Sequence, residues 1–415
     1  MPLPLRFAFY LEDYGKRFSL AELQRGDLAV GGGSARFRML FWLAARGHGV
    51  FLLNHYDGSS VDGVQGLKVN VPEEIPEVLG GLGRVHLFVF NYCERARQLI
   101  ALDIPAARAK LMWAGNPFAA GWLLSIDGVH LHRIACVSHY HREFFRPYPN
   151  FDRLEIVRCG IDLDLLEKVP EIERSGDLVV FVGAPRFSKG FHNVLDAWPL
   201  VRKVHQGARL RVVGSAELHD PNAVGGWTRV LDADLEVRHL DPVVGPCRDL
   251  AAVGIELAGL VPVREVFGEL RQASVVVVNC NWTGSFETHC RSAVEAQAAG
   301  APVVGAARGA LQEFVRHGET GWLVDEPSPR ALADAIVRLL SNERLRADFG
   351  KAGRKWGHTV GGYDRGVDDW ERIAERAISD EPAPAPKRLG GDLLRSVGYG
   401  RARIAARRLV RGSKV

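Results

Sequence analysis

Four consecutive valines, Val275 to Val278, constrain the fold of this chain more than any other segment. β-branched residues without polar alternation are typical of a strand buried on both faces, as in a parallel sheet. A loop follows, and the small residues of 293–299 predict a helix that ends at Gly300. A strand, a short loop and a helix place ligand-binding groups at the carboxyl end of a sheet. The segment therefore predicts an α/β fold with a site at that edge.

Two glutamates follow this strand, with seven residues between them. Glu287 lies in the predicted loop, and Glu295 lies about two turns inside the predicted helix, at about 3.6 residues per turn. Such pairs are more commonly solvent-exposed charges. Here alanine and valine surround Glu295, and an acid in so apolar a helix is costly to bury without a partner. The setting favours two acids that face one cleft and touch different parts of an elongated ligand.

The segment from Ile255 to Trp322 resembles the donor-binding region of retaining glycosyltransferase family 4, the glycosyl transferases group 1. That family carries a Glu, seven residues, and then Glu-Ala-x-Ala-x-Gly-x-Pro-Val-Val. This chain has Glu287, seven residues, and EAQAAGAPVV over 295–304, followed by Glu313 and GETGWLV over 318–324. The resemblance implies the GT-B fold, in which two Rossmann-like domains face each other across a cleft.

Length and composition agree with this α/β architecture. The chain has 415 residues, enough for two or three domains, and 47% hydrophobic residues can fill two cores. Alternating strands and helices predict a Rossmann-like acceptor-side domain over 1–168 and a nucleotide-sugar donor domain over 178–360. A helix over 361–380 is expected to cross back to the first domain, as the family's terminal helix does. An insertion over 217–254 stays unassigned.

The resemblance also implies which residues hold the donor diphosphate. The family has a Lys six residues after a strand-end Gly, and Lys189 stands six after Gly183. Ala184 occupies the usual Arg position, so Arg186 is the candidate for the second cation. Fixed positive charge would stabilise the phosphate as the sugar leaves.

Further donor contacts are expected from the two-glutamate motif. Glu287 would hold the sugar hydroxyls, and backbone N–H groups of Thr288, His289 and Cys290 would orient the sugar. Glu295 would bind the ribose hydroxyls, as acids do in other Rossmann sites. No second carboxylate is placed as a covalent nucleophile, unlike the paired acids of retaining glycosidases. The resemblance therefore implies front-face attack, with retention and with the leaving phosphate accepting the proton.

Two loops of the first half are expected to line the same cleft. Gly32 and Gly33 belong to a glycine run before a predicted helix, and the run fits neither GxGxxG nor the Walker pattern. In the family, a Gly-Gly loop here lines the diphosphate and acceptor side. Asn116 and Gly115 stand where many members carry a His that contacts the transferred sugar. Asn116 is the sugar-side candidate, although an Asn-Pro turn also explains it. His139 and His141 are further polar groups on which no expectation rests.

We expect Glu287, Lys189 and Arg186 to be the catalytic residues of a retaining hexosyltransferase. It would move a sugar from a nucleotide-diphospho-sugar to a hydroxyl of a glycan or lipid-linked acceptor. No metal or other cofactor is expected, because the DxD triplets at 162–164 and 232–234 are short patterns that chance produces often. A non-hydrolysing sugar-nucleotide epimerase and a degenerate, non-catalytic partner protein stay open as alternatives.

The carboxyl-terminal segment 381–415 carries a separate signal. From 387 onwards it holds nine Lys or Arg residues against one acid, with apolar residues interleaved. Such a segment suits either an anionic membrane surface or a solvated tail. The whole chain has a net charge of only +4, which gives a nucleic-acid role little support.

The expected location is cytoplasmic, with peripheral association at the inner face of the cell membrane as an extension. The six cysteines form no CxxC pair, which suits a reducing compartment. No signal peptide precedes the first predicted strand, and no apolar run approaches about 18 residues.

Overall fold

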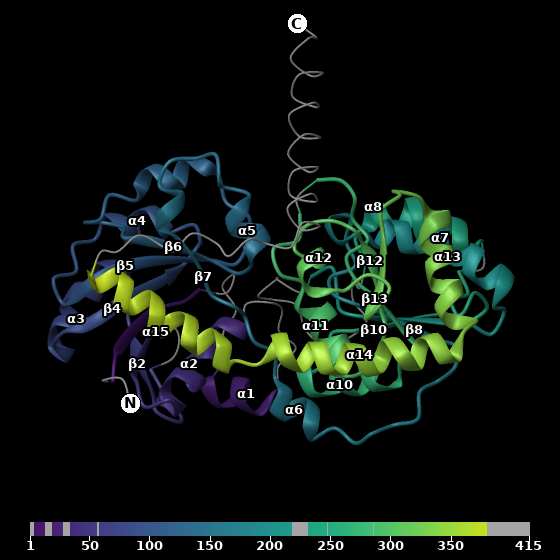
Figure 1. The fold of residues 1–415 in the computed structure, drawn as a ribbon, viewed down its shortest axis with the longest axis horizontal. Helices are drawn as coiled ribbons and strands as arrows, with labels where there is room; N and C mark the ends of the chain where they lie inside the picture. Colours follow the sequence, from purple (N-terminus) through teal and green to yellow (C-terminus); the bar gives the residue numbers. More distant parts are fainter. Residues whose placement is uncertain are drawn as a thin grey trace, which may run out of the picture.

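The computed structural model describes residues 4–12, 19–27, 34–55, 58–217, 231–246, 248–284 and 286–379. Within these residues the chain forms two parallel sheets, each covered by helices, and the two α/β units lie side by side in Figure 1. The predicted α/β architecture of two Rossmann-like units is confirmed. The predicted tail over 381–415 and the glycines Gly32 and Gly33 lie outside the described residues.

The first sheet has the strand order β3-β2-β1-β4-β5-β6-β7, and all of its neighbours run parallel. Its strands are β1 (Arg6–Tyr10), β2 (Gly49–Asn54), β3 (Val64–Lys68), β4 (Val85–Asn91), β5 (Ala107–Ala114), β6 (Arg133–Cys136) and β7 (Leu154–Ile156). Helical segments are α1 (Leu20–Arg25), α2 (Ser34–Ala45), η1 (Pro72–Glu74), α3 (Ile75–Leu82), α4 (Ala96–Ala101), η2 (Ala120–Ser125), α5 (His139–Glu143), η3 (Phe151–Arg153) and α6 (Leu163–Glu167). Consecutive residues of β1 point to opposite faces of the sheet, so that Phe9 enters one core and Tyr10 enters the other.

The second sheet has the order β10-β9-β8-β11-β12-β13, again parallel throughout. Its strands are β8 (Leu178–Val182), β9 (Arg209–Val213), β10 (Ile255–Gly259), β11 (Val275–Val277), β12 (Val303–Ala306) and β13 (Gly321–Val324). Its helical segments are η4 (Phe187–Lys189), α7 (Phe191–Val204), α8 (Ala233–Leu235), η5 (Glu236–Leu240), α9 (Asp241–Val244), α10 (Val263–Gln272), α11 (Arg291–Ala298), α12 (Leu311–Phe314), α13 (Pro329–Leu340) and α14 (Glu343–Gly361).

The valine run forms the strand that the sequence predicts. Val275 and Val277 pack into one core of the second domain, and Val276 packs into the core on the opposite face. Strand β11 lies between β8 and β12 in the sheet. The carboxyl ends of these three neighbouring strands therefore open onto the same edge, because all three run parallel.

The last described helix, α15 (Asp364–Ser379), packs against α2, β4 and β5 of the first domain. Figure 1 shows it continuing from α14, which lies on the second domain. Trp370 meets Phe9 and Trp113 edge to face, with ring centroids 5.6 and 5.1 Å apart. Asp369 pairs with Arg158, whose Nη2 lies 2.6 Å from Oδ1. The first domain is thus completed by the final part of the described chain.

The described part of the insertion over 217–254 is largely helical. Segments α8, η5 and α9 follow one another directly, and η5 is a π-helical turn. Both η5 and α9 contact α7. The ring of His239 in η5 lies 2.8 Å from Oδ1 of Asp196 in α7. This part of the insertion therefore forms a small helical layer over the second domain.

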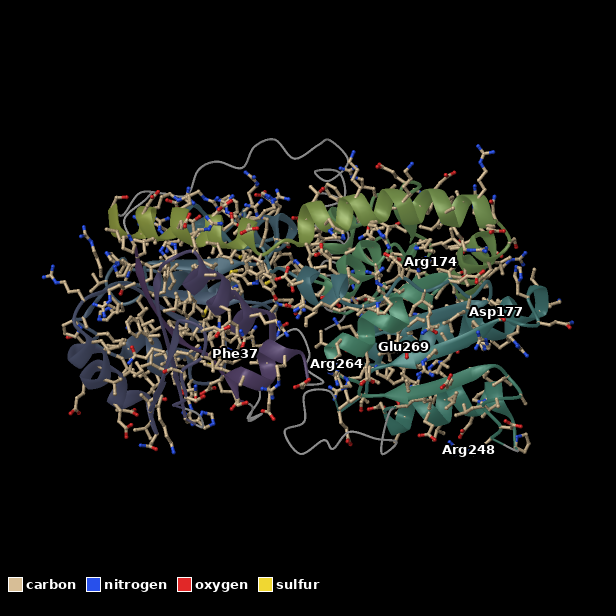
Figure 2. The ribbon with its side chains drawn as sticks, turned by 90° about the horizontal axis from the view of Figure 1, so that it is seen from below. Phe37, Arg174, Asp177, Arg248, Arg264 and Glu269 are labelled. Carbon is tan, nitrogen blue, oxygen red and sulfur yellow. The ribbon has the colours of Figure 1, made fainter. Side chains whose placement is uncertain are left out.

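Several polar contacts join the two domains. Arg264 at the start of α10 reaches Asp27, which follows α1, with Nη1 3.6 Å from Oδ1. Figure 2 shows Arg264 at the edge of the second domain that faces α2, the helix that carries Phe37.

Arg174 in the connecting segment donates to the carbonyl oxygens of Leu270 and Ala273. The connection is therefore anchored to the second domain.

Candidate functional site

An ion pair joins the ends of two neighbouring strands of the second sheet. Lys189 closes η4, after β8, and Glu287 lies in the loop after β11. The Lys189 Nζ is 2.5 Å from the Glu287 Oε2. Glu287 is mostly buried, with 14% of its side chain exposed, whereas Lys189 retains 39%. The structure thus brings together the two residues that the sequence assigned to the diphosphate and the sugar.

A third side chain, Asn279, completes this arrangement. Its Nδ2 donates to the same Oε2 of Glu287 at 2.5 Å. Burial alone would raise the pKa of Glu287, but Lys189 and Asn279 hold it below its usual value. Burial likewise opposes the charged form of Lys189, and the Glu287 carboxylate raises the pKa of that ammonium group. Both partners are therefore charged at neutral pH, and Glu287 Oε1 is left for another hydrogen bond.

Backbone contacts fix Lys189 against the loop after β11. Gly190 has φ +69°, and a Cβ on it would lie 2.1 Å from the Cys280 carbonyl carbon. The Cys280 N–H donates to the Lys189 carbonyl oxygen at 3.1 Å. Asn281 Nδ2 donates to the Ser188 carbonyl oxygen at 2.9 Å. A glycine at 190 lets the two loops touch, so that the lysine side chain needs no long reach to Glu287.

The backbone on either side of Glu287 is strained. Asn279 has φ 30° and Cys290 has φ 64°, values that residues with a side chain seldom adopt. Gly309, after β12, packs so closely on Glu287 that a Cβ would lie 2.7 Å from its carbonyl oxygen. The Ala310 N–H donates to that oxygen at 2.9 Å. Backbone strain of this kind persists where many surrounding contacts hold the backbone in place, and strained residues cluster at functional sites.

Thr288 links this loop to the first domain. Its Oγ1 donates to the Gly115 carbonyl oxygen, in the loop after β5, at 2.7 Å. The next residue, Asn116, is exposed. The structure therefore places the Gly115–Asn116 loop beside the two-glutamate loop.

The side chains of His289 and Cys290 are buried and uncharged. Burial lowers the pKa of His289 to about 4, and its ring packs 4.4 Å from that of Phe314. Burial raises the pKa of the Cys290 thiol to about 12. Neither side chain offers charge to a ligand at neutral pH.

The second glutamate of the motif belongs to a different cluster of charges. Glu295 is only 9% exposed, and its Oε1 lies 2.9 Å from Nη2 of Arg291, one turn earlier in α11. Asp162 pairs with Arg38 of α2 at 2.7 Å. Burial raises the pKa of Asp162 to about 6, with Arg38 and Arg291 opposing the shift and Glu295 adding to it. Glu295 therefore lies among charged groups of both domains.

The remaining predicted residues are placed as follows. Arg186 precedes η4 and is exposed, with no ion pair within the described residues. His141 is fully buried, and burial lowers its pKa to about 3. His139 lies at the start of α5, where its backbone N–H donates to Glu313 of α12 at 3.2 Å. The two histidines are therefore packed at the domain boundary.

Sequence reasoning missed two residues near the motif, Asn279 and Arg36. Asn279 was visible as a polar residue directly after four valines, but its reach to Glu287 depends on the path of the loop. Arg36 in α2 points towards Gly115, which stands far from it in the sequence. Only the folded chain brings these segments together.

Metal-binding clusters and membrane-spanning helices are both absent from the described residues. No group of three or more His, Cys, Asp or Glu side chains there could hold a metal ion. Within the same residues, no helix combines the length and apolar character that crossing a membrane requires.

A family model described as glycosyl transferases group 1 matches residues 176–342, which contain the second sheet and the Lys189–Glu287 pair. Within these residues the chain resembles the glycosyl transferases group 1 family. This match confirms the family resemblance drawn from the sequence.

Two curated relatives of this chain have names that refer to inositol-containing molecules. The D-inositol 3-phosphate glycosyltransferase of Corynebacterium glutamicum (strain R) is 31% identical over 218 residues, covering 48% of this chain and 46% of that protein. The phosphatidyl-myo-inositol mannosyltransferase of Mycobacterium leprae (strain TN) is 31% identical, covering 55% and 52%. The chain spans about half the length of the curated relatives it matches.

Solved structures match this chain over most of its length. A glycosyltransferase from Rickettsia africae superposes with a TM-score of 0.66 at 12% identity, covering 91% of this chain and 100% of that one. Anabaena HepE in complex with UDP-glucose superposes with a TM-score of 0.63 at 15% identity, covering 90% and 99%. At these identities the likeness shows the fold, and the GT-B architecture is confirmed.

Proposed function

We propose that this protein is a retaining group 1 glycosyltransferase that moves a sugar from a nucleotide-diphospho-sugar to an acceptor hydroxyl. The observation that carries the proposal is the Lys189–Glu287 pair, which Asn279 supports at the carboxyl edge of the second sheet. The adjoining Thr288 touches the first domain. The site is therefore adjacent to both domains, where a donor and an acceptor can meet.

In this proposal Lys189 holds the donor diphosphate, and Arg186 approaches it from the exposed start of η4. Glu287 binds sugar hydroxyls through its remaining oxygen, and Glu295 binds the ribose. Because the Glu287 carboxylate is ionised, it also opposes positive charge that develops on the anomeric carbon. A buried carboxylate with fixed partners needs little rearrangement as that charge appears.

The proposed reaction breaks the bond between the anomeric carbon and the leaving phosphate oxygen. The acceptor oxygen forms its new bond to the same face of that carbon, so the configuration is retained. The acceptor hydroxyl proton passes to the departing phosphate oxygen, which gives a nucleoside diphosphate and a glycoside. Lys189 stabilises the negative charge on the leaving group throughout. We propose that the lysine and arginine serve this purpose without a metal.

The acceptor class is proposed from the relatives. Their names include inositol phosphate and phosphatidyl-myo-inositol substrates. A glycan or a lipid-linked molecule is therefore the acceptor class that we propose, at the inner face of the cell membrane. The basic segment over 387–415 would favour that surface through its charge.

A thermal-shift panel of UDP-, GDP- and ADP-sugars tests donor binding. A ligand at about a hundredfold excess over its dissociation constant stabilises the folded state by about 2.7 kcal/mol. We expect one donor to raise the melting temperature of the wild type, and Glu295→Ala to lose most of that shift. Glu326→Gln, an exposed substitution, serves as the control. A well-folded protein that no donor stabilises would favour a degenerate, non-catalytic protein.

Product analysis then tests the transfer itself. With the donor identified in this way, nucleoside diphosphate should be released rapidly only when an acceptor is added. Glu287→Gln should lower the rate of sugar transfer at least about hundredfold. An α-linked product from an α-linked donor would support retention, and inversion would refute it. Conversion of the donor to an epimer without acceptor would identify an epimerase. Unchanged rates in EDTA would support metal-independent transfer.

A further inference from the structure

Arg36 occupies the space that a side chain at Gly115 would need. Arg36 lies in the first turn of α2, and Gly115 follows β5. A Cβ built on Gly115 would meet Arg36 Nη1 at 2.8 Å and no other neighbouring heavy atom of the described residues within 4 Å. Gly115 has no positive φ that would demand a glycine. The glycine therefore makes room for the guanidinium group.

Arg36 has no acidic partner among the described residues. It is partly buried, and its Nε is shielded from solvent without a hydrogen-bond partner there. The nearby carboxylates are already paired, Asp162 with Arg38 and Glu295 with Arg291. The charges of Arg291 and Arg36 both favour the ionised form of the adjacent Cys159 thiol. Among the described residues, no protein anion pairs with this partly buried cation.

The position of Arg36 relates it to the proposed sugar site. The Gly115 carbonyl oxygen accepts the hydrogen bond from Thr288, the residue after Glu287. Arg36 therefore lies beside the Gly115 loop, and that loop contacts Thr288, the neighbour of the carboxylate proposed to hold the sugar. A substrate group that meets Arg36 would belong to the sugar at Glu287 or to the acceptor beside it.

We propose that Arg36 binds a carboxylate or phosphate group of the substrate and so makes this enzyme selective for an anionic donor sugar or an anionic acceptor. A guanidinium group offers a planar fork of donors that fits both anions in a bidentate manner. The anion has two sources, a uronic acid as the transferred sugar or a phosphate on the acceptor. The inference rests on the proposed function, because it places a nucleotide-sugar and an acceptor in this cleft.

The experiment measures dissociation constants by calorimetry for matched neutral and anionic ligands. UDP-glucose against UDP-glucuronate, and GDP-mannose against GDP-mannuronate, test the transferred sugar. With saturating UDP or GDP, inositol against inositol 3-phosphate tests the acceptor. The proteins are the wild type, Arg36→Gln, Arg36→Lys and Gly115→Ala. Arg330→Gln, an exposed substitution, is the control.

The wild type should bind the anionic member of one pair about ten- to hundredfold more tightly than the neutral member. Arg36→Gln should abolish this preference, and Arg36→Lys should keep part of it, because a single charge remains without the fork. Gly115→Ala should weaken it as well, since the added methyl group displaces the guanidinium without removing its charge. Which pair responds identifies the source of the anion.

Two results would overturn the inference. One is a wild type that binds nucleotide-sugars but prefers no anionic member of any pair. The other is a preference that survives Arg36→Gln. Absence of binding by every nucleotide and nucleotide-sugar is a separate result, because it would overturn the proposed function and with it this inference.

Discussion

At the scale of single residues, the position of Glu287 is set by side chains and by backbone strain together. Lys189 and Asn279 both contact one oxygen of its carboxylate. The flanking Asn279 and Cys290 adopt left-handed backbone that costs on the order of 1–3 kcal/mol each. Contacts from the neighbouring loops offset this strain. The result is a carboxylate that is fixed and ionised before a ligand arrives.

Asn279→Asp should change the pH dependence of the enzyme. The new carboxylate would oppose ionisation of Glu287 and remove the amide donor, so the pKa of Glu287 would rise. Activity requires the ionised form in our proposal, and it would therefore be lost at a higher pH as the solution is acidified. The measurement is the acidic limb of the kcat/KM profile.

Asn279→Ala provides the matched comparison for that prediction. It removes the amide hydrogen bond without adding charge, so its acidic limb should move in the same direction by a smaller amount. Superposable pH profiles for wild type and both variants would show that Asn279 does not act on Glu287.

At the scale of elements, the joint between η4 and α7 determines where Lys189 lies. Gly190→Ala should destabilise the protein by about 1–3 kcal/mol and weaken donor binding, because the Cβ would collide with the Cys280 backbone. Chemical denaturation and calorimetry measure the two effects. Gly268→Ala, in α10 with no atom near the added methyl, should be neutral or slightly stabilising. Equal behaviour of the two variants would contradict this account.

Helix α15 gives a second prediction at this scale. Trp370 is fully buried against Phe9 and Trp113, so Trp370→Ala should cost about 3–5 kcal/mol of folding free energy. Urea unfolding measures this loss. Leu124→Ala, at a side chain that is 72% exposed, should cost little. A small effect at Trp370 would mean that α15 contributes little to the first domain.

Much of the fold was predictable from sequence, because strand burial and helix periodicity are local patterns. The Val275–Val278 run gave β11, and parallel strands brought Lys189 and Glu287 to one edge. Strand β3 has only a weak strand pattern, since its VQGLK sequence contains a glycine and two polar residues. The pairing of Glu295 with Arg291 was readable from their spacing of four on a helix. Contacts such as Arg36 with Gly115 depend on packing between distant segments, which no local pattern encodes.

At the scale of the whole molecule, helix α5 is one place where the two domains meet. Glu313 of α12 accepts the backbone N–H groups of His139 and Tyr140 at 3.2 and 3.0 Å. Phe286, next to Glu287, packs its ring 4.8 Å from that of Phe144. The loop that holds the proposed catalytic carboxylate is therefore part of the domain interface. Closure of the two domains on each other is for this reason coupled to the position of Glu287.

Closure of the domains should respond to pH through Glu313. Burial raises its pKa from 4.5 to about 7, against the opposing effects of the α5 N–H groups and Arg158. The closed form thus binds the proton more tightly than a form with Glu313 exposed. Closure should become more favourable as pH falls from about 7 towards 4.5. Small-angle scattering at about pH 5 and about pH 8 measures this as a change in radius of gyration.

Glu313→Gln should remove most of that pH dependence, because the amide does not titrate in this range. Glu326→Gln, at an exposed position of the same domain, should leave it intact. If the wild type and Glu313→Gln respond to pH alike, another group controls closure.

Helix α15 is translated long after the strands of the first domain that it packs against. Strands β1 to β7 are synthesised first, yet Trp370 of their core is among the last described residues to be translated. At about 5–20 residues per second, the ribosome needs on the order of ten seconds or more to reach it after β7. During that interval the nascent first domain exposes the apolar groove that α15 later fills. A chaperone that binds nascent chains would find its substrate there, and the two domains would mature together rather than in order of synthesis.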